Sequence, residues 1–311
     1  MTEAVAVRSR RLSSRLMLVV VTVVISMMLV MGLVLAEAYR NADGVARARA
    51  LEAARNAMAA VDRDLSTSFT AMEVLALLPE LQNGDMAAFA PHAERFLARA
   101  RKGVTLAVIE PDGQLIFSTA AKPGSALPKR ENPVTADVVF VQKKQRVSEV
   151  RLGTVVKRPL LSMDIPVFKG DAVVYDLAIN PTREAFFGIL QQLALPESWT
   201  VSLLDENANH IARLPALPDD SLVPAPDSLR AVLKTGNNRV VETLSADGAP
   251  MLTAFSHSLD YGWTMAVGIP RAEIDAPAQQ LVFMAAALSL VVLVAGLVMA
   301  RRLMRLKTDE R

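Results

Sequence analysis

The chain has 311 residues, of which 52% are hydrophobic, and its formal net charge is +2. This length allows one large or two ordinary domains. The apolar fraction exceeds the roughly 45–50% of soluble domains because two apolar blocks lie near the chain ends, which excludes a plain cytosolic protein. Cysteine is absent, so neither a disulfide framework nor a cysteine-based metal site can form.

The basic charge lies in the two terminal segments. Four Arg and one Glu give residues 1–15 a net charge of +3, and five basic and two acidic residues give residues 301–311 the same charge. The residues between them therefore carry a net charge of −4. Positive charge confined to the tails does not indicate a nucleic-acid partner.

The first apolar block, residues 16–35, reads LMLVVVTVVISMMLVMGLVL and contains no charge. At 1.5 Å per residue, about 20 helical residues cross the roughly 30 Å hydrocarbon layer. A cleaved signal peptide ending at Ala36-Glu37-Ala38 is the alternative, but such apolar cores usually run only about 7–15 residues. The block therefore predicts a transmembrane helix.

The second block, residues 281–300, is equally free of charge and predicts a second transmembrane helix within residues 275–300. A buried core helix is the alternative. Both basic tails lie on the terminal side of their block, and positive residues beside a span stay in the cytoplasm. We expect residues 1–15 and 301–311 to be cytoplasmic and residues 36–280 to lie in the periplasm, outside a bacterial inner membrane.

A long helix is predicted to continue from the first span. Residues 36–78 contain no Pro and are rich in Ala, Arg and Glu, and Pro79 then closes the helix. Apolar side chains recur at steps of three and four, at Leu51, Ala54, Met58, Val61, Leu65, Phe69, Met72, Leu75 and Leu78. This stripe fits either packing on its own domain or the seam of a homodimer.

A strand–turn–strand pattern then occurs twice. After a short helix over residues 86–100, whose start we place nearer Ala90 because of Pro91, strands are predicted at 106–109 and 114–119, around a Glu-Pro-Asp-Gly turn. The same pattern returns about 95 residues later at 199–204 and 210–214. Strand pairs at 158–168 with 172–180, and at 251–259 with 263–269, repeat in the same way.

An extra strand precedes each second pair, at 147–150 and at 240–244, and a Pro-rich loop over 214–227 crosses the second copy. Two tandem antiparallel sheets explain this repeat better than one large domain. The predicted class is therefore α+β, with a stalk helix and first sheet module over residues 36–194 and a second module over residues 195–274.

This order of elements resembles the double Cache sensor region of bacterial transmembrane receptors, which has two tandem PAS-like sheets. The local likeness is greatest in LPESWTVSLLDENANHIAR (195–213) and ADGAPMLTAFSHSLDYGWTMAVGIP (246–270), which are similar to sensor histidine kinases. The resemblance implies signal transduction, with ligand binding in the first, membrane-distal module. The Arg-x-Trp-Tyr motif of amino-acid-sensing members is absent from the chain.

The main polar cluster lies in the first module. Arg158, Ser162 and Asp164 share one face of their predicted strand, and a three-residue hairpin loop at 169–171 places Asp164 opposite Asp176 and Ser162 opposite Ala178. The predicted ligand-binding residues are Arg158, Ser162, Asp164, Asp176 and Asn180. Paired carboxylates beside an Arg suit a small zwitterion. The nearby basic residues Arg151, Lys157 and Arg158 suit an anion. The alternative interpretation is that these residues form an ordinary solvated face.

Catalytic signals are missing from the sequence. His92, His210 and His257 form no recognisable metal-ligand cluster, and no P-loop, nucleophile elbow or Gly-rich phosphate cradle occurs. We therefore expect no enzyme, no cofactor and no metal site. Trp199 and Trp263 are predicted to pack in the core of the second module rather than against a ligand.

These features predict a membrane-anchored periplasmic sensor that binds a small ligand and signals, as a homodimer, to a cytoplasmic kinase or other output of two-component type. Only 11 residues follow the second span, so we expect either the sensing part of a longer receptor or a chain that pairs with a separate output protein. A membrane-anchored periplasmic interaction module without a small ligand is the main alternative, and a tethered hydrolase is a third.

Overall fold

The computed structural model describes residues 2–100, 103–122, 124–153, 155–216, 223–233, 239–245 and 247–306. Part of the loop predicted over 214–227 and the end of the C-terminal tail, 307–311, lie outside the described residues. The chain divides into two units, one comprising Met1–Ala46 with Arg271–Arg311 and the other Arg47–Pro270.

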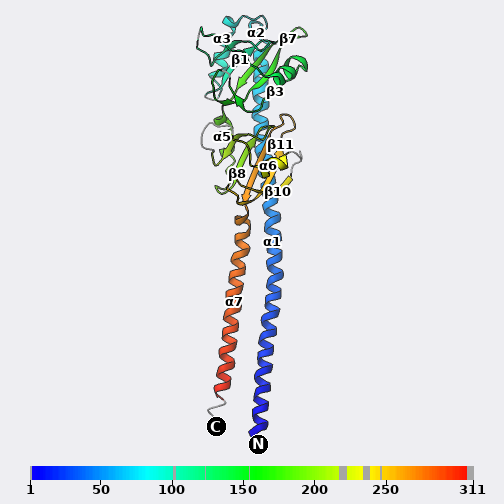
Figure 1. The fold of residues 1–311 in the computed structure, drawn as a ribbon, viewed down its shortest axis with the longest axis vertical. Coiled ribbons are helices and arrows are strands. Elements are labelled where there is room, and N and C mark those ends of the chain that lie inside the picture. Colours follow the sequence, from blue (N-terminus) through cyan, green and yellow to red (C-terminus); the bar gives the residue numbers. More distant parts are fainter. Residues whose placement is uncertain are drawn as a thin grey trace. The chain divides into compact units, whose positions relative to one another are not determined.

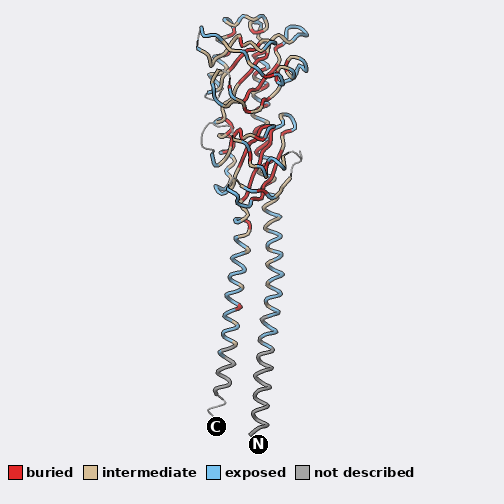
Figure 2. The backbone as a smooth tube through the Cα atoms, in the orientation of Figure 1, coloured by how far each residue is buried: buried red, intermediate tan, exposed pale blue. Residues whose placement is uncertain are grey.

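The first unit consists of helical segments from both ends of the chain. Helix α1, Thr2–Ala76, contains the first apolar block, and α7, Arg271–Leu306, contains the second. Both are long and apolar enough to cross a membrane, and most of their described side chains in the apolar blocks are exposed (Figure 2). Arg271 at the start of α7 contacts Asp43 and Tyr39 of α1, with its guanidinium 5.5 Å from the Tyr39 ring centre.

The stripe along α1 is buried within the second unit. Ala54, Met58, Val61, Leu65, Phe69 and Met72 are each no more than 2% exposed. This confirms that the stripe packs on its own domain, whereas the homodimer seam stays a prediction. The helix ends at Ala76, two residues before the predicted end, and Pro79 begins the short helix α2, Pro79–Gln82.

Two five-stranded sheets form the core of the second unit (Figures 1 and 2). The first has the order β2-β1-β7-β6-β3 and is antiparallel throughout. Its strands are β1 Thr105–Ile109, β2 Leu115–Ser118, β3 Arg146–Val147, β6 Met163–Lys169 and β7 Ala172–Asn180. A separate two-stranded ribbon pairs β4, Arg151–Leu152, with β5, Pro159–Leu160.

The second sheet has the order β10-β11-β12-β8-β9 and is also antiparallel. Its strands are β8 Thr200–Leu204, β9 His210–Leu214, β10 Arg239–Leu244, β11 Pro250–His257 and β12 Thr264–Pro270. Strands β2, β1, β7, β6 and β3 therefore correspond in order to β9, β8, β12, β11 and β10. This correspondence confirms the predicted repeat and the α+β class.

Local differences from the predicted elements have identifiable causes. Helix α3, Met86–Leu97, begins at Met86 rather than near Ala90 because the Asp85 carboxylate caps it, accepting a hydrogen bond of 3.0 Å from the Ala88 amide. The strand predicted at 158–168 is broken after Leu160, where β5 ends. The strand predicted at 147–150 is replaced by the two-residue β3, which begins one residue earlier and overlaps the prediction only at Val147.

Further helical segments connect the strands: α4 Pro133–Ala136, a π-helical turn Asp137–Val141, α5 Arg183–Gln191 and α6 Asp227–Leu233. Helix α5 joins the two sheets. Phe186 packs edge-on against Trp263, which is 1% exposed, with ring centres 5.4 Å apart. The Arg183 guanidinium donates hydrogen bonds to the Ile211 and His210 carbonyls of β9.

Candidate functional site

The two acidic residues predicted for the first sheet lie on adjacent strands and share one face. The hairpin closes through Gly170 and Asp171, and a bulge at Val167/Phe168 shifts the register. Asp164 therefore pairs with Ala178, and Asp176 pairs with Pro166, which corrects the predicted pairing of Asp164 with Asp176 by two residues. The carboxylates remain diagonal neighbours on the same face.

A guanidinium that the sequence did not indicate lies between these carboxylates. The Nη1 atom of Arg130 donates to Asp164 Oδ1 at 2.7 Å, and its Nη2 atom donates to Asp176 Oδ2. The Arg130 side chain is 9% exposed and both carboxylates are 0% exposed. The alternative interpretation, in which these carboxylates lie on an ordinary solvated face, is therefore wrong.

Ser162 extends this network. Its hydroxyl donates to Asp164 Oδ2 at 2.6 Å and accepts a hydrogen bond from Arg151 Nη2 at 3.3 Å. The Ser162 amide donates to the Ser148 hydroxyl at 2.9 Å, and the Ser148 amide donates to the Ser162 carbonyl at 2.8 Å. Arg130, Arg151, Ser162 and the two Asp residues thus form one connected group.

Burial and charge set the protonation behaviour of this group. Burial, together with the charge of Asp164, raises the pKa of Asp176 well above its ordinary value, and the contacts with Arg130 oppose this rise. Burial acts to lower the pKa of Arg130, but the two carboxylates outweigh it and raise the pKa. Burial lowers the pKa of Arg151, although Asp164 opposes the change. Within this group, one buried acceptor, Asp176 Oδ1, and one buried donor, Arg151 Nε, have no hydrogen-bond partner among the described residues.

A small cavity of about 40 Å³ adjoins the network on this face of the sheet. Both guanidiniums line it, together with Thr105, Ser118 and Asn180 as polar neighbours. The remaining lining residues are small or aliphatic: Ala107, Ile109, Leu115, Ala120, Gly153, Val155, Val156, Leu160 and Ala178. The charged groups that face this space are therefore cationic, and the carboxylates lie behind Arg130.

The structure brings together three of the five predicted ligand-binding residues, Ser162, Asp164 and Asp176. Asn180 lines the same cavity and donates to the Thr105 hydroxyl at 3.3 Å. Arg158 does not join them: it is exposed, precedes the β5 ribbon and lines a separate small cleft beside Asn180. Lys157 is likewise exposed.

The sequence did not predict Arg130 as a site residue, because Arg130 lies in an irregular, Pro-flanked segment. Its amide donates to the Gly113 carbonyl at 2.8 Å, which fixes the segment against the β1–β2 turn. Gly113 has φ of +91°, and an added Cβ would lie 2.5 Å from the Arg130 carbonyl oxygen. The Pro-Asp-Gly turn was recognisable in the sequence, but its contact with residue 130 was not.

The remaining predictions concern the two Trp residues and possible metal ligands. Trp263 packs in the core as predicted, and Trp199 is partly buried. Among the described residues, no group of three or more His, Asp or Glu side chains gathers as metal ligands would.

No protein-family model and no curated protein matches the chain. Solved structures do match it. The ligand-binding domain of the Campylobacter jejuni chemoreceptor Tlp3, in complex with L-valine, has a TM-score of 0.55 at 12% identity and covers 76% of this chain and 97% of its own. The double Cache fold is confirmed.

Two further matches agree. The extracellular domain of the putative histidine kinase soHK1S-Z6 has a TM-score of 0.55 at 12% identity, covering 77% of this chain and 99% of its own. The ligand-binding domain of the Pseudomonas aeruginosa amino acid chemoreceptor PctB, in complex with L-Arg, has a TM-score of 0.51 at 15% identity, covering 71% and 94%. These Cache neighbours are sensory domains rather than catalytic ones.

Proposed function

We propose that the chain is a membrane-anchored periplasmic sensor, which binds a small ligand at the cavity of the first sheet and signals to a kinase-type output in the cytoplasm. The supporting observation is the buried Arg130–Asp164–Asp176 group beside this cavity, in a fold that chemoreceptors and histidine kinases use as a sensory domain. The pairing of these groups offsets the cost of burying their charges, and their position beside a cavity favours a binding role.

The ligand carries a carboxylate. Arg130 and Arg151 are the charged residues that line the cavity, and the Nε atom of Arg151 is buried without a hydrogen-bond partner. A carboxylate accepts paired hydrogen bonds from such guanidiniums, and Asn180 and Thr105 supply further polar contacts. The amino acids bound by the Tlp3 and PctB domains also carry this group. An ammonium group, by contrast, has to displace Arg130 to reach Asp164 and Asp176.

Transmission begins with the hydrogen-bonded path from this group to the second sheet. Ser162 bonds Ser148, and two residues later the Val150 amide donates to the Asp205 carboxylate at 2.9 Å. Arg146 also contacts Glu206 at 2.7 Å. A ligand that prefers one arrangement of this path shifts the balance between two conformations. In a homodimer with two spans per chain, that shift reaches the cytoplasm through α1 and α7.

The test uses the full chain in lipid nanodiscs and measures its melting temperature against a library of small metabolites. One class of carboxylate ligand should raise the melting temperature by several degrees. Arg151→Met should abolish the shift, because Arg151 lines the cavity, and Arg158→Met should preserve it, because Arg158 is exposed and lies outside. Absence of a shift with every compound would overturn the proposal in favour of a module that binds a protein partner.

Membrane topology is tested separately with reporter fusions. Reporters that are active only in the cytoplasm should be active at both chain ends and inactive within residues 36–280. A periplasmic signal at either end would contradict the two-span arrangement.

A further inference from the structure

A groove of about 820 Å³ lies on the opposite face of the first sheet from the cavity. Ala178 and Asn180 of β7 line the cavity, whereas Ile179 of the same strand lines the groove, because neighbouring residues of a strand face opposite sides of the sheet. The walls of the groove are α1, from Asp64 onward, and α3 with the residues that follow it. The groove is therefore a separate surface of the first module.

The floor of the groove, formed by the sheet and by α5, is apolar. Met163 of β6 and its register partner Ile179 are 2% and 4% exposed, and Phe186 of α5 is 1% exposed. On the wall formed by α1, Val74 lines the groove and is 64% exposed. Contact of apolar surface with water is unfavourable, and an apolar patch that polar residues border is typical of an interaction site. The groove therefore suits an occupant with an apolar part.

The wall formed by α3 is basic. Arg95 and Arg99 line the groove four residues apart, a spacing that places two side chains on the same side of a helix. Arg99 follows the end of α3, but its amide still donates to the Phe96 carbonyl at 3.1 Å, so the helical turn continues. His92 lines the same wall. Among the described residues, Asp64 on the α1 wall is the one acidic residue that lines the groove, so the α3 wall suits an anionic group.

The shape of the groove favours a narrow occupant. A helix with its side chains is about 10–12 Å across, whereas an unbranched alkyl chain is one carbon atom wide. Met163, Ile179 and Phe186 line the groove although they are at most 4% exposed, so only a thin group reaches them. A second copy of the chain that packs along α1 would cover Val74 but would leave this floor empty.

We propose that this groove binds an anionic amphiphile, a fatty acid with an unbranched alkyl chain such as decanoate. The carboxylate accepts hydrogen bonds from Arg95 and Arg99, and the alkyl chain lies against the floor residues Met163, Ile179 and Phe186. The volume of about 820 Å³ falls within the roughly 300–1,000 Å³ of small-ligand sites. This site goes beyond the proposed sensor function and does not depend on a ligand in the first cavity.

The chain contains no cysteine, so Val74→Cys places a single thiol in the groove of the full chain. In nanodiscs, decanoate should saturably slow the reaction of this thiol with a maleimide. Leu259→Cys, at a residue that is 98% exposed and lies outside the groove, should react at an unchanged rate. Each methylene added from octanoate to dodecanoate should tighten binding about fourfold. Decanol, which has the same chain without the charge, should bind at least tenfold more weakly than decanoate.

Charge variants in the Val74→Cys chain test the α3 wall. Arg95→Met and Arg99→Met should each weaken decanoate binding at least tenfold, and both should fold normally because the two residues are exposed, as judged by circular dichroism. Arg230→Met, at a partly exposed residue of α6 outside the groove, should leave binding unchanged. The proposal is overturned if decanoate does not slow labelling, if decanol protects equally, or if both Arg variants bind decanoate normally. Disulfide formation between two Val74→Cys chains that decanoate does not prevent would also overturn it and would assign this face to the predicted homodimer.

Discussion

Removing the Arg130 guanidinium tests the buried charge group directly. The Arg130 side chain is 9% exposed and lies between two carboxylates that are 0% exposed. In Arg130→Met the side chain keeps much of its volume, but Asp164 and Asp176 lose their shared cation. Breaking a buried ion pair by removing one partner costs about 3–5 kcal/mol. Because one cation here serves two carboxylates, we expect a loss in the upper half of that range.

The loss should depend on pH. Burial already raises the pKa of Asp176, and Arg130 opposes that rise, so in Arg130→Met the folded-state pKa of Asp176 lies still further above its unfolded value. The folded variant then binds more protons than the unfolded chain, and its stability increases as pH falls from 8 towards 5. The free energy of unfolding is measured by urea denaturation of the full chain in detergent, followed by circular dichroism.

The matched control is the triple variant Arg130→Met, Asp164→Asn, Asp176→Asn, which removes the charges together and should recover much of the stability at pH 8. A loss below about 1 kcal/mol in Arg130→Met would refute the argument, because it would mean that the carboxylates find another cation or water. An equal loss at pH 5 and pH 8 would refute it as well.

Three further changes test other parts of the fold by the same denaturation assay. Asp205→Ala should lower the free energy of unfolding by about 3 kcal/mol, because the buried carboxylate accepts hydrogen bonds from the amides of Asn207, Asn209 and Val150. Asp205→Asn should lower it by less. Equal losses in the two variants would contradict this role of the carboxylate. Trp263→Ala should cost about 3–5 kcal/mol because Trp263 is 1% exposed, while Leu259→Ser, at a residue 98% exposed, should change stability by less than about 0.5 kcal/mol. The pKa of His210 is lowered from 6.5 to about 4, so between these pH values the unfolded chain binds a proton that the folded chain does not. The free energy of unfolding should therefore fall by up to about 3 kcal/mol as pH drops through this range. His210→Gln should remove this part of the pH dependence, and an unchanged pH dependence would contradict the assignment.

The sheets were predictable because their signals are local. Turn residues such as Pro111, Asp112 and Gly113 lie between two apolar segments. The same pattern returns about 95 residues later, so each predicted strand pair supports the other. The hairpin register was less accessible, since a bulge at Val167/Phe168 and a two-residue turn at Gly170–Asp171 are not visible in the residue pattern.

The site residues show the same division between local and distant information. Asp164 and Asp176 share a face because both belong to strands of one hairpin. Arg158 was grouped with them by extending the alternation through residue 161, but the chain leaves the sheet there and β5 pairs with β4 instead. Arg130 lies 34 and 46 residues from its two partners, and no periodicity connects positions so far apart in an irregular segment.

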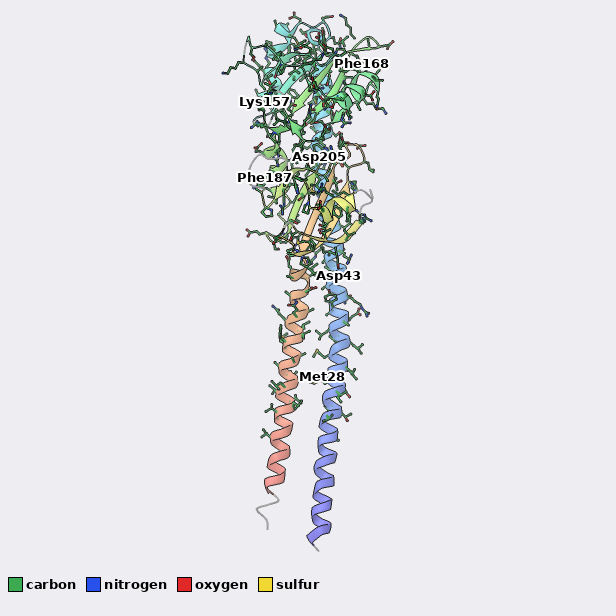
Figure 3. All side chains as sticks on the ribbon, viewed as in Figure 1. Met28, Asp43, Lys157, Phe168, Phe187 and Asp205 are labelled. Carbon is green, nitrogen blue, oxygen red and sulfur yellow. The ribbon has the colours of Figure 1, made fainter. Side chains whose placement is uncertain are left out.

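The end of strand β8 is connected to the buried charge group of the first sheet. The residue after β8, Asp205 (labelled in Figure 3), accepts a hydrogen bond from the Val150 amide. Val150 lies two residues after Ser148, whose hydroxyl accepts a hydrogen bond from the Ser162 amide of the buried charge group. A ligand of the first sheet that binds one position of Asp205 better than another therefore biases the end of β8 as well. Such coupling is reciprocal, so a change that holds the end of β8 in one position has to alter ligand affinity at the first sheet by the same factor by which the ligand shifts the equilibrium of β8.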